Sequence, residues 1–234
     1  MELKLLAQFT RKQKFADFFI QDTEALGELE GLTNLISKEI TNEFLKEHPY
    51  AYITLPNIDT AKRILERSVF IKSFNLVFGE EQTLDKVLET INKESVCKFM
   101  AEHSGSIAFC IETVNKSTDV SERKKRIGDF IAFFELGTRK IDLENPDIVL
   151  KLIEVYKYGD TGSSLKAYFV AEILKNPSSY AKFALSDRAY IGPTTTDHEL
   201  AILMANQALV REGSYVYDPF CGTCGLLLIC AHYG

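Results

Sequence analysis

Short strands and short helices alternate along the first 80 residues, and prolines or glycines close several of them. The clearest strand, Tyr50–Leu55, lies between Pro49 and Pro56, and such residues mark the ends of strands. The order strand, helix, strand, helix, strand predicts a small split β-α-β unit. The predicted elements are strand Leu3–Phe9, helix Glu24–Leu29 before Gly31, strand Tyr50–Leu55, helix Thr60–Arg67 capped by Asp59, and strand Val69–Phe78 ending at Gly79.

A second α+β unit is predicted up to about residue 175. Its clearest helix carries Ile127, Phe130, Ile131 and Phe134 at the spacing of one apolar helix face. The predicted elements are helix Thr83–Asn92, strand Ser106–Val114, a helix from a cap at Asp119 or Ser121 through Phe134, strand Arg139–Leu143, and a hairpin of Ile148–Tyr156 and Lys166–Leu174 across the turn Gly159–Gly162.

Composition excludes several classes of protein. With 46% apolar and 26% charged residues, the chain is neither disordered nor low in complexity. No apolar run approaches the roughly 18 residues of a membrane helix, and the N-terminus is not a signal peptide. Five scattered cysteines indicate reduced thiols, so we expect a cytoplasmic protein. A net charge of −6 excludes coating of nucleic acid by bulk charge, but not a local basic face.

The pattern changes near the C-terminus. Thr196 and Glu199 form a capping-box pattern for a helix to about Arg211, which would bury Leu203 and Met204 and end at Gly213. A short strand, Tyr215–Tyr217, then enters the loop Asp218–Gly225, and an apolar helix, Leu226–Tyr233, follows. Strand, small-residue loop and helix are the first elements of a doubly wound nucleotide-type fold.

The loop has the chemistry of a small-ligand site. Gly222 and Gly225 carry no side chain, so a ligand can approach the backbone. Loop N–H groups and the helix N-terminus can hold a carboxylate or phosphate, and Asp218 can accept a hydrogen bond from an ammonium or hydroxyl. The alternative is that Asp218 only caps the loop. The pattern is not the dinucleotide motif G-x-G-x-x-G, and no Walker lysine follows it.

The segments DPFCGTCGLLLICAHYG and RAYIGPTTTDHELAILMANQAL resemble the eukaryotic and archaeal tRNA guanine-N2 methyltransferases that act at tRNA position ten, and especially the catalytic subunit of the two-subunit eukaryotic enzyme. The resemblance implies an α+β ferredoxin-like domain (1–80), a THUMP RNA-binding domain (81–176) and the start of an α/β Rossmann-like methyltransferase domain (187–234). It also implies S-adenosyl-L-methionine as cofactor, tRNA as substrate and a small zinc-containing activator subunit as partner.

The same resemblance assigns cofactor contacts to two segments, the loop and the stretch Gly192–Asp197. The residues assigned are Asp218, Pro219, Gly222, Thr223, Gly225, Thr194, Thr195 and Thr196. One departure is Cys224, where the family usually has glycine. If this position needs a positive φ, a cysteine there costs about 1–2 kcal/mol.

The family's catalytic motif, an acidic residue or Asn followed by Pro-Pro and an aromatic residue, does not occur, because the chain contains no Pro-Pro. In that motif oxygen acceptors restore the nucleophilicity of the guanine amine while the aromatic ring stacks on the base. We therefore predict no catalytic residue in this chain and expect it to be truncated and inactive alone. A non-catalytic RNA- or partner-binding module, and another Asp-Pro-Phe-type amino methyltransferase, are the alternatives.

The densest basic run is Arg123–Arg126, and Arg139 and Lys140 are expected nearby. In an acidic protein a local basic face such as this would contact RNA phosphates, although a solvated helix face is an equal alternative. Cys221 and Cys224 form a single CxxC, which is also compatible with half a zinc site or a redox pair.

Overall fold

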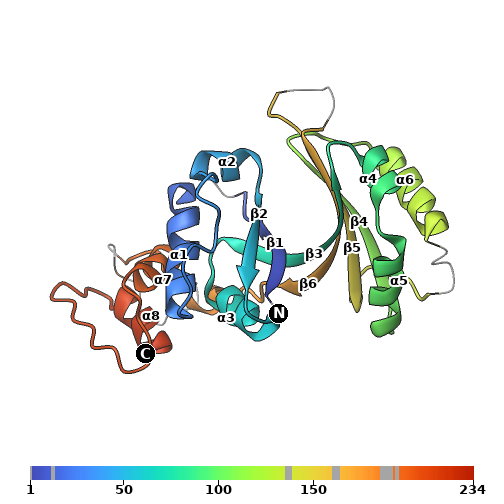
Figure 1. Ribbon diagram of the computed structural model, residues 1–234. Helices are drawn as coiled ribbons and strands as arrows, with labels where there is room; N and C mark the ends of the chain where they lie inside the picture. Colours follow the sequence, from blue (N-terminus) through green and yellow to red (C-terminus); the bar gives the residue numbers. More distant parts are fainter. Residues whose placement is uncertain (1, 12–13, 135–138, 160–163, 185–191, 193–194) are drawn as a thin grey trace. The chain divides into compact units, whose positions relative to one another are not determined.

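The computed structural model describes residues 2–11, 14–134, 139–159, 164–184, 192 and 195–234, and Figure 1 shows its elements in chain order. The chain divides into two compact units. The first combines Met1–Phe74 with Leu174–Gly234, and the second is Asn75–Ile173. The predicted domains at 1–80 and 81–176 stay predictions. The separate domain at 187–234 stays a prediction.

The first unit begins with the predicted alternation of strands and helices. β1 pairs antiparallel with β2 and lies between β2 and β3 in the sheet, so a third strand separates the two strands that α3 connects. This is the strand order of a split β-α-β unit. The elements are β1 (Leu3–Phe9), α1 (Phe19–Leu29), α2 (Asn42–Glu47), β2 (Tyr50–Leu55), α3 (Ile58–Arg67) and β3 (Ile71–Glu81).

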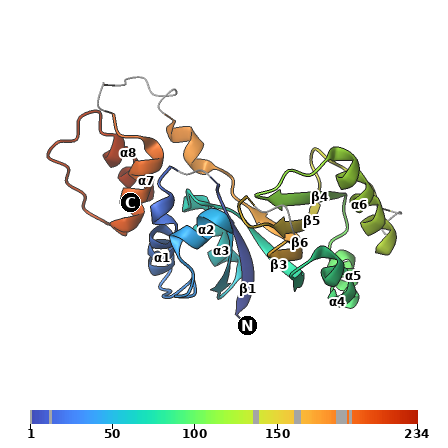
Figure 2. The same ribbon diagram turned by 90° about the horizontal axis from the view of Figure 1, so that it is seen from above.

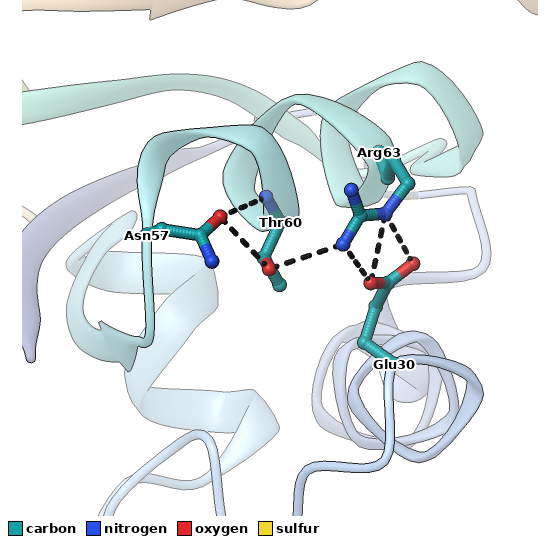
Figure 3. A network of polar contacts seen from close by, with 4 residues as sticks. All are labelled: Glu30, Asn57, Thr60 and Arg63. Atoms are coloured by element: carbon teal, nitrogen blue, oxygen red, sulfur yellow. Dashed lines mark hydrogen bonds and ion pairs between the residues drawn. The ribbon is translucent and has the colours of Figure 1, made fainter.

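Helix α3 begins two residues before the predicted start, because its cap is Asn57 and not Asp59. The Asn57 side chain accepts a hydrogen bond from the backbone N–H of Thr60 at 2.9 Å, as Figure 3 shows. The guanidinium of Arg63 donates to both carboxylate oxygens of Glu30, with Nη2 2.6 Å from Oε2. This ion pair joins α3 to Glu30, the residue that directly follows α1.

The C-terminal segment of the first unit packs on its N-terminal part through α7 (His198–Gln207), which contacts α1 and α8 (Gly225–Tyr233). The three helices lie side by side in Figure 1 and Figure 2. The cap of α7 is Asp197 rather than Thr196, and Leu209, at φ 52°, ends the helix before Gly213. The side chains that α7 buries are Ala201, Ile202, Leu203, Ala205 and Asn206. Met204 is 44% exposed, contrary to the prediction.

The strand predicted at Tyr215–Tyr217 is wrong, because these residues form no ladder with any described strand. Tyr215 and Tyr217 are fully or almost fully exposed. A β-strand needs a neighbour for its backbone hydrogen bonds, and the local sequence pattern does not reveal whether one is present.

In the second unit α6 connects two parallel strands, β4 and β5, and β6 pairs antiparallel with β5. The helices α4, α5 and α6 contribute to one apolar core with these strands. In Figure 1 these helices cover one face of β4 and β5. The elements are α4 (Leu84–Thr90), α5 (Lys93–Glu102), β4 (Ile107–Val114), α6 (Val120–Phe133), β5 (Ile148–Val155) and β6 (Lys166–Lys175).

Two elements of this unit differ from the prediction. Helix α5 was not predicted, although Asn92 caps it and Val96 and Met100 are buried one turn apart. Instead of the strand predicted at Arg139–Leu143, the described residues 139–143 make one isolated bridge, between Ile141 and Ile107. Of the predicted hairpin turn, residues 160–162 lie outside the described residues. No helix in the described part of the chain is long and apolar enough to cross a membrane.

Candidate functional site

The loop Asp218–Gly225 consists of two tight turns. A carboxylate oxygen of Asp218 accepts the backbone N–H of Phe220 at 2.9 Å, and the backbone N–H of Cys224 donates to the carbonyl of Cys221 at 2.7 Å. Gly222 (φ 51°) and Cys224 (φ 58°) are both left-handed. Position 224 therefore does require a positive φ, which for a residue with a Cβ costs about 1–2 kcal/mol.

The two segments predicted to border the cofactor contact one another. The hydroxyl of Thr223 donates to the Thr195 hydroxyl oxygen, and the two oxygens are 2.9 Å apart. The Thr195 hydroxyl also lies 2.9 Å from the carbonyl of Gly192. A Cβ at Gly192 would lie 2.8 Å from the Thr223 methyl group. Glycine at 192 thus permits the close approach of the upstream segment to the loop.

The remaining predicted cofactor residues are placed as follows. Gly225 is buried and is the first residue of α8, so the helix N-terminus faces the end of the loop. Pro219 is exposed and Thr196 is half-buried, and Thr194 lies outside the described residues. The Asp218 carboxylate takes part in its own turn, which is the capping role that the sequence left open.

The thiols of the CxxC lie together. The thiol of Cys221 is hydrogen-bonded to that of Cys224, and this contact is the main reason that the pKa of Cys221 is raised. Among the described residues no group of three or more His, Cys, Asp or Glu side chains could hold a metal ion. The CxxC therefore has no third protein ligand in the described part of the chain.

The predicted RNA-binding residues fall into two groups. Arg126 pairs with Glu154 at 2.5 Å and with Glu122 at 2.6 Å. Arg139 donates to the backbone carbonyls of Met100 and His103 and so caps the end of α5. These two arginines support the fold. Arg123 is half-buried, whereas the side chains on an accessible surface are those of Lys124, Lys125 and Lys140.

Sequence reasoning missed a buried polar network in the first unit. Asn206 of α7 donates to the carboxylate of Asp22 at 2.8 Å and accepts from Nε of Arg67 at 2.6 Å. Burial raises the pKa of Asp22 to about 7. The Arg67 guanidinium lies 4.0 Å from the centre of the Tyr233 ring. The sequence signal that could have indicated this network is Asp22, a charged residue among the buried positions of α1.

Comparison with known proteins shows the family of domains to which this chain belongs. Residues 4–174 match the family described as the Tmrp11 THUMP N-terminal domain, and the chain belongs to this family. Within the matched residues the sheet is mixed, because β4 is parallel to β5 and β6 is antiparallel to β5.

Particular relatives are similar over most of this chain. The tRNA (guanine(10)-N(2))-methyltransferase TRMT11 of Dictyostelium discoideum is 29% identical over 95% of this chain and 48% of its own length. The human protein of the same name is 30% identical over 83% of this chain and 43% of its own. The chain thus spans about half the length of these curated relatives.

One solved structure supports the fold. The crystal structure of TrmN from Thermus thermophilus has a TM-score of 0.53, with 16% identity, and covers 98% of this chain and 62% of that one. At this identity the likeness concerns the fold alone.

Proposed function

We propose that this chain is the tRNA-binding portion of an S-adenosylmethionine-dependent tRNA guanine-N2 methyltransferase acting at position ten, together with the start of its catalytic domain. The observation that carries the proposal is the similarity to relatives of that activity over 83–95% of the chain. Its N-terminal part would comprise a ferredoxin-like and a THUMP domain. Because the chain spans about half of those relatives, we assign it binding and not the complete reaction.

The contact between Thr195 and Thr223 supports a cofactor site at the loop. The residues present fit the methionine part of S-adenosylmethionine. Backbone N–H groups of the loop and the N-terminus of α8 would hold its carboxylate, and Asp218 would accept from its ammonium. When bound, the cofactor supplies an electrophilic methyl group. By the same resemblance the complete enzyme would work in the cytoplasm with a small zinc-containing activator subunit.

For tRNA the proposal rests on exposed lysines of the second unit. Among the described residues Lys124 and Lys125 of α6 have no ion pairs like those that hold Arg126. Lys140 is 79% exposed at its side chain and lies 3.9 Å from Asp142. Each lysine that meets a phosphate releases counterions, so binding by this face must weaken as salt rises. A net charge of −6 makes such a local patch necessary for RNA binding.

The test is charge reversal at the two α6 lysines. We expect Lys124→Glu with Lys125→Glu to weaken tRNA binding about tenfold or more and to reduce the slope of log K against log salt by roughly two. Filter binding or fluorescence anisotropy across a salt series measures both. Lys124→Arg with Lys125→Arg should bind like the unaltered chain, and Lys98→Glu on α5 is the matched reversal elsewhere. Unchanged affinity in the double reversal would show that this face does not bind tRNA.

A non-catalytic RNA-binding module is the second candidate, since the exposed lysines of α6 need no cofactor to bind RNA. Equilibrium dialysis with labelled S-adenosylmethionine separates the two candidates. We expect no tight binding to this chain alone, and restored binding and methyl transfer when the chain is extended by the C-terminal half of a relative. Failure of the extended chain to bind the cofactor would favour the non-catalytic module.

A further inference from the structure

The turn that ends the loop brings two cysteines close together. Cys221 and Cys224 are the first and fourth residues of a turn closed by the 2.7 Å bond from the N–H of Cys224 to the carbonyl of Cys221. In such a turn the Cα atoms of these two residues are less than about 7 Å apart, and disulfides span about 4.4–6.8 Å between Cα atoms. The backbone of this turn therefore holds the two cysteines within the range that a disulfide spans.

A neighbouring cysteine in the same turn, together with partial access to solvent, distinguishes this pair from the other cysteines. Cys224 is exposed and Cys221 half-buried, whereas Cys230, on the helix that follows, is buried. Cys97 and Cys110 are exposed, but they lie on α5 and β4, and neither has a cysteine neighbour in its own element. Two neighbouring thiols are all that an intramolecular disulfide requires.

We propose that Cys221 and Cys224 form a reversible dithiol–disulfide site in the loop that precedes α8. With hydrogen peroxide as oxidant, the thiolate of the more exposed Cys224 attacks one peroxide oxygen, which gives a sulfenic acid and one water. The thiol of Cys221 then displaces the sulfenic oxygen as a second water and the S–S bond forms. A dithiol reductant reverses the step by thiol–disulfide exchange.

The disulfide would fix the turn in which Cys224 is left-handed, at φ 58°. Because the loop backbone is the predicted cofactor contact, any effect of oxidation on S-adenosylmethionine rests on the proposed function. Formation of the disulfide itself does not rest on the proposed function. The experiment below therefore contains neither cofactor nor RNA, so its failure and that of the proposed function are distinguishable.

The full chain is reduced, freed of reductant and exposed to a small excess of hydrogen peroxide, and peptides are mapped under non-reducing conditions over time. We expect Cys221 and Cys224 to become cross-linked without a lasting sulfenic acid, because the neighbouring thiol resolves the sulfenic acid at once, whereas Cys97 should keep its oxidised adduct. Dithiothreitol should remove the cross-link. Cys221→Ser should instead leave a persistent sulfenic acid at Cys224, and Cys97→Ser should change nothing.

Separate adducts on the two cysteines without a cross-link would overturn the proposal, as would disulfides formed only between molecules. Circular dichroism of each variant before oxidation shows whether it is folded. If Cys221→Ser does not fold, the time course of the unaltered chain decides alone, with Cys97 in the same sample as the internal reference.

Discussion

Asp22 shows how one buried residue sets a property of the whole first unit. Its side chain is 1% exposed, and Oδ2 has no hydrogen-bond partner among the described residues. The amide of Asn206 and the charge of Arg67 lower its pKa, but burial outweighs them and the pKa is raised to about 7. In the folded chain the Asp22 carboxyl group therefore keeps its proton up to about pH 7. In the unfolded chain the same group loses its proton near pH 4.

The sign of the pH dependence follows from these two pKa values. Between about pH 4 and pH 7 the folded chain binds more protons at this site than the unfolded chain. The contribution of protonated Asp22 to the free energy of unfolding is thus fully present below pH 4 and is lost as the pH rises to 7. We expect Asp22→Asn to flatten this slope and to be more stable than the unaltered chain at pH 8 by about 2 kcal/mol. Urea unfolding at a series of pH values measures this.

Asp59→Asn is the control for that prediction, since the Asp59 side chain is 70% exposed and its replacement should leave the profile unchanged. Parallel pH profiles for Asp22→Asn and the unaltered chain would contradict the assignment. They would mean that Asp22 is charged in the folded protein across this range.

Among the elements, α6 is attached to the sheet by charge as well as by its apolar face. Arg126 pairs with Glu154 on β5, whose side chain is only 6% exposed, and the hydroxyl of Tyr156 donates to the same carboxylate at 3.1 Å. Removing the arginine leaves a buried carboxylate with one donor fewer. The cost of such a change exceeds the value of a surface ion pair.

We expect Arg126→Gln to lower the free energy of unfolding by about 2 kcal/mol, less than for a fully buried pair because the arginine is 28% exposed. Adding Glu154→Gln should recover part of the loss. Lys124→Gln, on the same helix, should change stability by less than about 0.5 kcal/mol. A loss in the double variant equal to the sum of the losses in Arg126→Gln and Glu154→Gln, measured by urea unfolding, would show that the two side chains are not coupled.

Local patterns explain which elements could be predicted from the sequence. Tyr50–Leu55 is fixed by its flanking prolines, and the apolar spacing that ends at Phe134 identifies α6 within one residue. Tyr215–Tyr217 has the composition of a strand, but a strand depends on a partner that its own residues do not specify. The basic run predicted that Arg126 contacts phosphates, whereas in the structure Arg126 pairs with Glu154. The sequence pattern could not reveal this partner, because Glu154 lies 28 residues away in the sequence.

At the scale of the molecule, the first unit is made from two ends of the chain. Ile202 of α7 is fully buried, although α7 and α1 are far apart in sequence. We expect Ile202→Ala to lower the stability of this unit by about 2–4 kcal/mol. In hydrogen exchange on the full chain, amides of β1 and β2 should lose protection along with those of α7.

Met204→Ala, at a half-exposed position of the same helix, is the control and should cost less than about 0.5 kcal/mol. Loss of protection confined to α7 would contradict the expectation. It would indicate that the C-terminal segment unfolds independently of the N-terminal strands.

This discontinuity matters while the protein is being made. Residues Met1–Phe74 leave the ribosome first, but their partner segment begins only at Leu174. At about 5–20 residues per second, the face of α1 that α7 will cover waits roughly ten seconds for α7 to be synthesised. During that interval the nascent chain leaves uncovered the part of α1 around Asp22, the later partner of Asn206, and this surface is open to a chaperone or to aggregation. The second unit, continuous in sequence, is free to fold while the first is still waiting.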